Sequence, residues 1–250
     1  MPLFAVVVAA ALAAGPPAAD APLPETPRGY ADALTQVRPA QRAAARAWDG
    51  ERPVPEELAA DALYEQRMAL ALADSKRLRK RVLPLLPARE RGGVRDEVRA
   101  QVDLNRLARG WPVKRRYKTG KAEAPDALWR YYGRGHKRFK VGRALLAAVN
   151  LVESSYNRLR SDSVAGAQGP MQFIPSTWEA YGLGGDIHDP HDAILGAANY
   201  LHANGSPTEN GRALYHYNPS QLYVDAVLRY ARRMRGPARF RFYYARSLFV

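Results

Sequence analysis

Apolar side chains recur at three- and four-residue steps along most of this chain, which is the spacing of one face of an α-helix. The clearest case follows Gly142, where large apolar residues share one face and alanines fill the remaining turns. The apolar positions of this face are Leu145, Leu146, Val149, Val152 and Tyr156. Because such a segment has little polar surface, we expect it to form a largely buried helix.

Two further helical patterns come earlier, over residues 54–110, and we expect them to form a helical hairpin. The first opens at Pro55, has two glutamates in its first turn and is predicted to run to about Lys80. The second is predicted from about Val94 to Arg109. We expect this hairpin to pack as an appendage on the domain that follows it.

Helical patterns also continue after the central segment. Asp189 is a predicted N-cap, and Pro190 takes the first position of the helix that it opens. Two more helices are predicted to begin at Pro207 and at Pro219. The pattern as a whole therefore predicts an all-α chain.

The first residues have the pattern of a secretory signal, which we assign to residues 1–21. The apolar run over residues 3–14 is shorter than the roughly 20 residues that span a bilayer, and small residues follow it. No Lys or Arg precedes the run, which departs from the usual signal. We expect secretion or export to the cell envelope, with a linker and a short helical segment over residues 22–53.

Charge and cysteine content narrow the class of protein. The net charge of +14 favours an anionic partner, and nucleic acid, a membrane and a bacterial cell wall all satisfy this condition. With no cysteine, the chain has no disulfide, no zinc–thiolate site and no thiol nucleophile. Basic and aromatic residues alternate around the connector at residues 111–126, but no nucleic-acid-binding motif accompanies them. We therefore expect adhesion to an anionic surface and no nucleic-acid partner.

One carboxyl group stands out inside the central helix. Glu153 falls in its last turns, four residues after Val149, where burial would raise its pKa and make it a proton donor near neutral pH. Asn150 and Asn157 share its face and could hydrogen-bond either Glu153 or a ligand.

A loop with glycines follows this helix. Gly166 and Gly169 allow the backbone to approach another group closely, and Gln172 then lies between Met171 and Phe173. A polar amide between two large apolar side chains suits a neutral polar ligand such as a sugar amide.

These features belong to an ordered set of motifs. The motifs are Glu153-Ser154, the run SVAGAQGPMQ over residues 163–172, Thr177-Trp178, AANYL over residues 197–201, Tyr217-Asn218 and Tyr223-Val224. Together they resemble the lytic transglycosylase domain of bacterial peptidoglycan-cleaving enzymes, over roughly residues 131–235. The sequence departs from this family at Pro170, where leucine is commoner, and at Pro219, where alanine and glycine usually follow the asparagine. The resemblance implies a lysozyme-like domain, which we place at residues 127–236.

The resemblance also implies a mechanism with a single carboxyl group. Glu153 would protonate the glycosidic oxygen between N-acetylmuramic acid and N-acetylglucosamine, while the N-acetyl carbonyl of the substrate assists at the anomeric carbon. The Glu153 carboxylate would then accept the proton of the C6 hydroxyl, which closes a 1,6-anhydro ring. Neither an activated water, a second carboxylate, a metal nor a cofactor is required, and we expect none of these.

Roles for five substrate-binding residues follow from the same resemblance. Ser163 and Gln172 would hold the N-acetyl group or the backbone around it. Met171 would pack beneath the sugar. Tyr217 would place its hydroxyl near Glu153, and Asn218 would shape the same wall. The partners implied are peptidoglycan strands and the anionic cell wall, while the oligomeric state is left open.

Two other functions compete with this one. A hydrolysing lysozyme on the same fold would need a second carboxylate, such as Asp162, to activate water. A cationic wall-binding protein with a degenerate site would need no catalytic group. Ser154 is expected to hydrogen-bond within its helix, because no His–carboxylate pair is evident to activate it as a nucleophile.

Two sets of residues carry weaker signals. Five acids and histidines resemble potential metal ligands, but their spacing matches no known site and helix capping explains two of them. They are Asp186, His188, Asp189, His191 and Asp192. The basic and aromatic tail at residues 237–250 could lie over the domain, form a short strand or contact the wall.

Overall fold

The computed structural model describes residues 20–109 and 118–247. The predicted secretory signal lies outside these residues except for its last two positions. Residues 111–117 of the basic connector also lie outside them. Within the described residues no helix is both long enough and apolar enough to cross a membrane.

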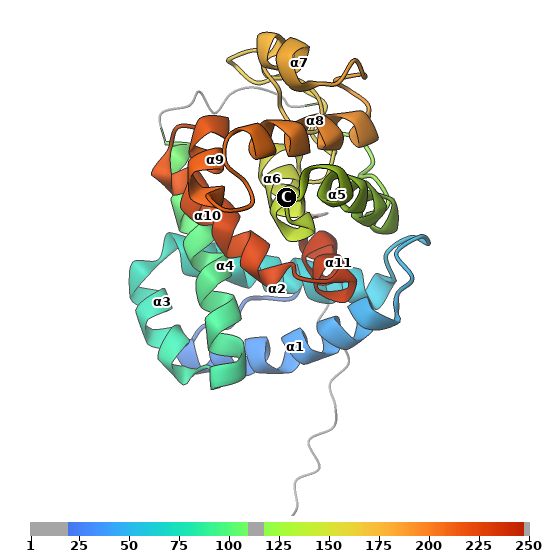
Figure 1. Cartoon of the computed structure of the whole chain (residues 1–250). Coiled ribbons are helices and arrows are strands. Elements are labelled where there is room, and N and C mark those ends of the chain that lie inside the picture. The colour runs from blue at the N-terminus through green and yellow to red at the C-terminus, as the bar shows by residue number, and fades with distance from the viewer. Residues whose placement is uncertain (1–19, 110–117, 248–250) are drawn as a thin grey trace, which may run out of the picture.

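Helices make up the regular structure of the described part of the chain (Figure 1). They are α1 (Pro27–Ala47), α2 (Glu56–Asp74), α3 (Lys76–Val82), the 3-10 turn η1 (Leu83–Leu85), α4 (Ala88–Leu107), α5 (Pro125–Phe139), α6 (Arg143–Ser154), α7 (Pro175–Tyr181), α8 (Pro190–Ala203), α9 (Asn210–Tyr217), α10 (Gln221–Arg233) and α11 (Pro237–Ser247). The described residues contain two isolated antiparallel bridges and no longer strand. The all-α prediction is confirmed.

The N-terminal region is larger than the predicted hairpin. The segment expected to be a linker with a short helical piece contains the 21-residue helix α1, which Thr26 caps through its side chain. The helix predicted to reach Lys80 ends at Asp74, because Ser75 adopts an extended backbone and caps α3. Helix α4 begins at Ala88, ahead of the predicted start at Val94.

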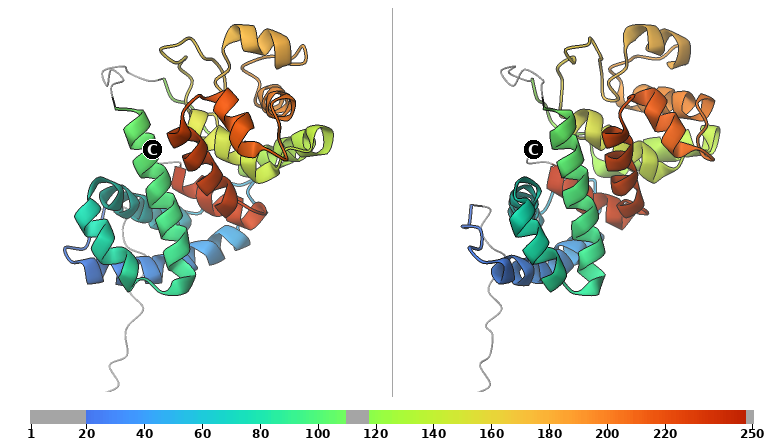
Figure 2. Two further views of the ribbon diagram at one scale, coloured as in Figure 1. Left: turned by 60° about the vertical axis from the view of Figure 1, so that its left-hand side comes forward. Right: turned by 90° about the vertical axis from the view of Figure 1, so that its left-hand side faces the viewer.

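Helix α11 connects the two halves of the molecule, which are the N-terminal helices α1 to α4 and the helices α5 to α10 that follow them. It packs against α1 and α2 on one side and against α5 and α6 on the other (Figures 1 and 2). Its Phe240 ring stacks on Trp129 at a centroid distance of 5.3 Å and meets Tyr132 and Tyr156 edge-on at 5.6 and 5.4 Å. Residues 237–247 of the tail, whose conformation was left open, therefore form a helix in the core.

Two apolar cores result from this packing. The first lies among α1 to α4 and includes the fully buried Met68 and Leu72. The second lies among α5, α6, α8, α10 and α11 and includes Leu146 and Ile194. Helix α4 also runs along α10, so the N-terminal helices support the second core from outside.

The described part of the basic connector lies beside the chain that follows α6. Gly120 N donates to the carbonyl of Arg158, and Arg160 N donates to the carbonyl of Lys118, each over 2.8 Å. These bonds keep the connector close to the end of the helix that carries Glu153.

Candidate active site

The end of α6 carries the candidate catalytic residue. Glu153 is the penultimate residue of this helix, and three consecutive non-glycine residues in the left-handed region follow soon after it. Their φ angles are 48° at Ser155, 58° at Tyr156 and 70° at Asn157. Left-handed backbone costs roughly 1–3 kcal/mol per residue, so surrounding contacts must hold this turn in place.

A buried hydrogen-bond network supplies those contacts. Ser154 Oγ donates to the carbonyl of Pro170 over 2.6 Å and accepts the backbone N–H of Asn157 over 3.0 Å. Asn150 Nδ2 lies 3.0 Å from both the Pro170 carbonyl and Asn157 Oδ1, and Tyr132 donates to Asn150 Oδ1 over 2.7 Å. The two asparagines therefore hold the loop and the helix end together. Their hydrogen bonds go to these groups, whereas the sequence predicts bonds to Glu153 or a ligand.

The glycine-containing loop is shaped by its own contacts. Gly169 has a φ of 72°, and a Cβ built on it would lie 1.9 Å from the carbonyl oxygen of Ile187. The close approach predicted at this glycine is therefore to another backbone segment. Ser163 Oγ accepts from Ala167 N over 2.9 Å, and Gln172 Nε2 donates to the carbonyl of Gly169 over 3.0 Å.

The environment of Glu153 suits proton transfer. Burial raises the pKa of its carboxyl group to about 7, even though the Tyr223 hydroxyl, 2.6 Å from Oε1, acts to lower it. No Lys, Arg or His of the described residues forms an ion pair with Glu153, and the residue keeps some exposed surface. A carboxyl group with this pKa is present in both protonation states at neutral pH, which is what a group serving as acid and then as base requires.

Two tyrosines near this carboxyl group have different hydrogen bonds. The rings of Tyr217 and Tyr223 are parallel, with centroids 6.5 Å apart. Tyr223 donates to Glu153, whereas Tyr217 donates to the carbonyl of Met171 over 2.6 Å. The charge of Glu153 acts to raise the pKa of both tyrosines, so both lie near it, and Tyr223 makes the direct hydrogen bond.

The comparison with protein families bears on this arrangement. Residues 130–235 match the family model of the transglycosylase SLT domain. This part of the chain is a transglycosylase SLT domain. The match confirms the resemblance found over residues 131–235, together with its lysozyme-like, all-α fold and a substrate in peptidoglycan. No curated protein and no solved structure matches the chain.

Two predicted sugar contacts in the SLT domain have other surroundings. The Met171 side chain is fully buried in the core of the SLT domain. That Met171 packs beneath the sugar stays a prediction. Asn218 is partly exposed at the end of α9, where its backbone N–H bonds Leu214 and its carbonyl accepts from Ser220.

The acids of the SLT domain near α8 are used in capping. Asp189 Oδ1 accepts from the backbone N–H of Asp192 over 2.9 Å, as predicted. Ligand atoms of Asp189, His191 and Asp192 lie within 4.8 Å of one another. However, Asp192 accepts from the backbone N–H of Asp186 over 3.1 Å, and the Arg134 guanidinium lies 3.0 Å from His191 Nε2. A guanidinium at this position opposes a second cation there.

Proposed function

We propose that the SLT domain is a lytic transglycosylase that cleaves the β-1,4 bond between N-acetylmuramic acid and N-acetylglucosamine without water. The single observation that carries this proposal is the state of Glu153, which has a pKa of about 7 and a hydroxyl as its hydrogen-bond partner. Burial and the Tyr223 bond are the two effects that set this pKa, and neither comes from another carboxylate.

The reaction follows from one carboxyl group that changes its protonation state. Protonated Glu153 gives its proton to the glycosidic oxygen, and the bond to the anomeric carbon breaks as the substrate's N-acetyl oxygen bonds that carbon. The Glu153 carboxylate then accepts the proton of the C6 hydroxyl, whose oxygen displaces the N-acetyl oxygen. The products are a 1,6-anhydromuramoyl end and a free N-acetylglucosamine end, and Glu153 is protonated again.

The surrounding residues have positioning roles in this proposal. Tyr223 would orient the carboxyl group and stabilise its charged form after the first proton transfer. Ser163 and Gln172 would hold the loop that receives the N-acetyl group, since their side chains bond that loop's own backbone. Asn218 would form part of the exposed wall.

The test is the exchange of Glu153 for glutamine, which keeps the shape of the side chain but removes the titrating proton. General acid–base catalysis contributes about 10²–10⁴-fold, so Glu153→Gln is expected to lower turnover by at least this factor. The measurement is the release of anhydro-muropeptides from purified peptidoglycan, followed by mass spectrometry. Glu179→Gln, at an exposed glutamate of α7, is the matched control.

Two outcomes would contradict the proposal. A folded Glu153→Gln protein that works at the parent rate would remove the assignment of the catalytic residue. Reducing ends instead of anhydro ends in the parent digest would identify a hydrolysing lysozyme, and no cleavage at all would favour a wall-binding protein.

We also propose that the protein is exported to the cell envelope, where its substrate lies. The apolar run at residues 3–14 and the excess of basic residues support this location and adhesion to the anionic wall. N-terminal sequencing of the protein recovered from the cell envelope is expected to give a start near residue 22. Recovery of the intact chain from the cytoplasm alone would contradict it.

A further inference from the structure

A second candidate site lies away from Glu153. A cavity of about 760 Å³ opens between α1, the start of α4 and the connection from α10 to α11. Its volume is in the range of small-molecule sites. The arginines that line it are Arg38, Arg42, Arg46, Arg89, Arg233, Arg235 and Arg239. Glu90 is the one acid among the lining residues.

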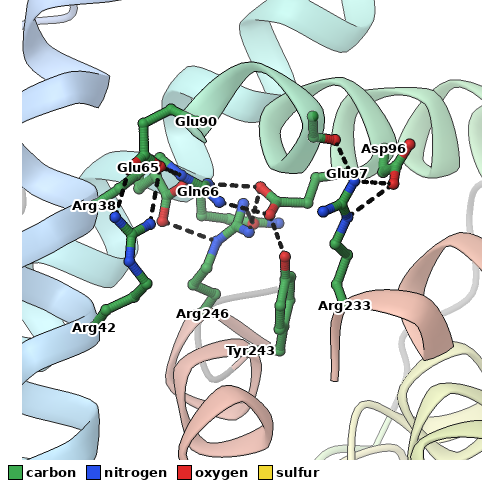
Figure 3. A network of polar contacts seen from close by, with 11 residues as sticks. Arg38, Arg42, Glu65, Gln66, Glu90, Asp96, Glu97, Arg233, Tyr243 and Arg246 are labelled. Atoms are coloured by element: carbon green, nitrogen blue, oxygen red, sulfur yellow. Dashed lines mark hydrogen bonds and ion pairs between the residues drawn. The ribbon is translucent and has the colours of Figure 1, made fainter. Parts of the chain in front are cut away.

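Three of these arginines are already neutralised and form the fixed wall (Figure 3). Glu90 accepts from Arg38 Nε over 3.1 Å and from Arg42 Nη1 over 2.8 Å. Arg233 Nε donates to Asp96 over 2.8 Å. The negative charge of Glu90 is thus shared between the guanidinium groups of Arg38 and Arg42. Glu90 makes no ion pair with the other arginines that line the cavity.

The remaining four arginines are exposed and make no ion pair with any carboxylate of the described residues. They are Arg46 on α1, Arg89 on α4, Arg235 in the connection from α10 to α11, and Arg239 in the first turn of α11. Positive charges that converge on one cavity repel each other and raise the local concentration of anions. The cavity therefore has four positive charges that no carboxylate of the described residues balances.

Two glycines in α4 leave room for the arginines of this wall. Gly92 and Gly93 lie inside the helix, where each glycine costs about 1 kcal/mol relative to alanine. A Cβ on Gly93 would lie 2.9 Å from Arg38 Nη2, and one on Gly92 would lie 3.3 Å from Arg233 Nη2. The two glycines thus let guanidinium groups lie against the helix, and the Gly92 carbonyl accepts from Arg233 over 2.8 Å.

Two helix N-termini add to the positive potential. Helix α4 begins at Ala88 and α11 begins at Pro237, and first-turn residues of both helices line the cavity. The free N–H groups of a helix N-terminus carry a partial positive charge and bind phosphate groups in many proteins.

We propose that this cavity binds a ligand that carries at least two phosphate groups. Arginine forks match the oxygens of phosphate in bidentate pairs, and two phosphates supply the charge that four unpaired guanidinium groups require. The lining aromatics, Phe242 and Tyr243, are buried, so no ring is free to stack on a base. None of the large exposed apolar side chains lines the cavity either. The diphosphate is therefore a soluble compound or the headgroup of a lipid whose chains lie elsewhere.

The probe for this proposal is inorganic pyrophosphate, titrated calorimetrically into the full chain at low ionic strength. Arg235→Gln/Arg239→Gln removes two unpaired arginines and is expected to weaken binding at least tenfold. Arg77→Gln/Arg99→Gln removes the same charge from two exposed positions outside the cavity and is expected to keep binding within about twofold of the parent. Thermal melting of all three proteins verifies that they fold.

Three further measurements separate the possible results. Absence of pyrophosphate binding, or an equal loss in both double variants, overturns the proposal. Succinate binding as tightly as pyrophosphate overturns the choice of phosphate over carboxylate. Vesicles of phosphatidylcholine with a lipid diphosphate assign the source: binding that needs Arg235 and Arg239 supports a lipid headgroup, and binding of pyrophosphate alone supports a soluble ligand. Peptidoglycan cleavage by the cavity variant is expected to be unchanged, because neither arginine belongs to the catalytic machinery.

Discussion

Two buried glutamates, one in each half of the molecule, have opposite protonation behaviour. Burial acts to raise the pKa of both groups. At Glu97 on α4 the guanidinium groups of Arg246 and Arg38 reverse this effect and lower the pKa to about 2. At Glu153 a tyrosine hydroxyl opposes burial only in part, and the pKa stays at about 7. At these two glutamates the hydrogen-bond and ion-pair partners therefore decide the direction of the pKa shift.

The buried polar groups of the two halves also differ, because those of the N-terminal region are mostly charged and those beside Glu153 are neutral. The N-terminal region and α11 enclose a network of three carboxylates and three guanidinium groups (Figure 3). Its members are Glu65, Glu90, Glu97, Arg38, Arg42 and Arg246. The SLT domain instead places neutral groups, Asn150, Ser154 and Asn157, next to the turn that follows Glu153. Cations at that position would hold Glu153 ionised and remove the acid from the reaction.

The largest expected effect comes from removing the paired carboxylate. Glu97→Gln leaves Arg38 and Arg246 without one of their counter-charges, and breaking such a buried pair costs roughly 3–5 kcal/mol of stability. Urea denaturation at neutral pH measures this loss, with Glu179→Gln as the exposed control that is expected to match the parent. A loss no greater than that of the control would show that Glu97 is not held as the structure indicates.

The ion pairs of Glu97 with Arg38 and Arg246 also make the stability of the protein depend on pH. Because the pKa of Glu97 is lowered on folding, its contribution to stability is present above the ordinary glutamate pKa near 4.5 and is lost as pH falls toward about 2. The Glu97→Gln variant should therefore lack this part of the acid-induced loss of stability.

A smaller effect, of opposite sign, is expected at Glu153. Its pKa is raised on folding from about 4.5 to about 7, so the parent loses stability as pH rises through this window. Glu153→Gln removes that loss and is expected to stabilise the protein at pH values above 7 by roughly 1–3 kcal/mol. The measurement is thermal melting of variant and parent across the window. A difference in melting temperature between variant and parent that is the same at both ends of this pH window would refute a raised pKa.

The smallest effect concerns the hydroxyl partner. In the proposed mechanism cleavage requires protonated Glu153, so kcat/KM should fall as pH rises through about 7. Tyr223→Phe removes the bond that lowers this pKa, and the alkaline limb is expected to move up by about one pH unit. Tyr217→Phe is the control, because its hydroxyl bonds the carbonyl of Met171. An identical shift in both variants would indicate an indirect effect of packing.

The sequence predicted the parts of the site that local pattern determines. The buried helix that ends near Glu153, the raised pKa and the Asp189 cap all depend on residues within a few turns of one another. The sequence assigned the hydroxyl near Glu153 to Tyr217 and did not reveal the direct bond from Tyr223, because both tyrosines lie in motifs of the family and more than sixty residues after Glu153. Burial of Met171 likewise depends on packing between helices.

Two features of the fold were missed because local signals opposed the tertiary contacts. Gly92 and Gly93 indicate a break, yet α4 continues through them because Arg38 and Arg233 occupy the space that side chains would take. In α11 the alternation of arginine and phenylalanine resembles a strand. The contacts of Phe240 and the ion pairs of Arg246 favour the helix instead.

Helix α11 also determines what can fold alone. The family match ends at residue 235, before Phe240, whose ring covers Trp129, Tyr132 and Tyr156. We therefore expect a fragment limited to the matched residues, which would expose these rings to water, to be less stable than the full chain. The same helix carries Arg246 into the network of the N-terminal region. Loss of α11 would expose the second core and remove Arg246 from the buried ion pairs of the N-terminal region, so we expect the two halves to depend on each other for stability.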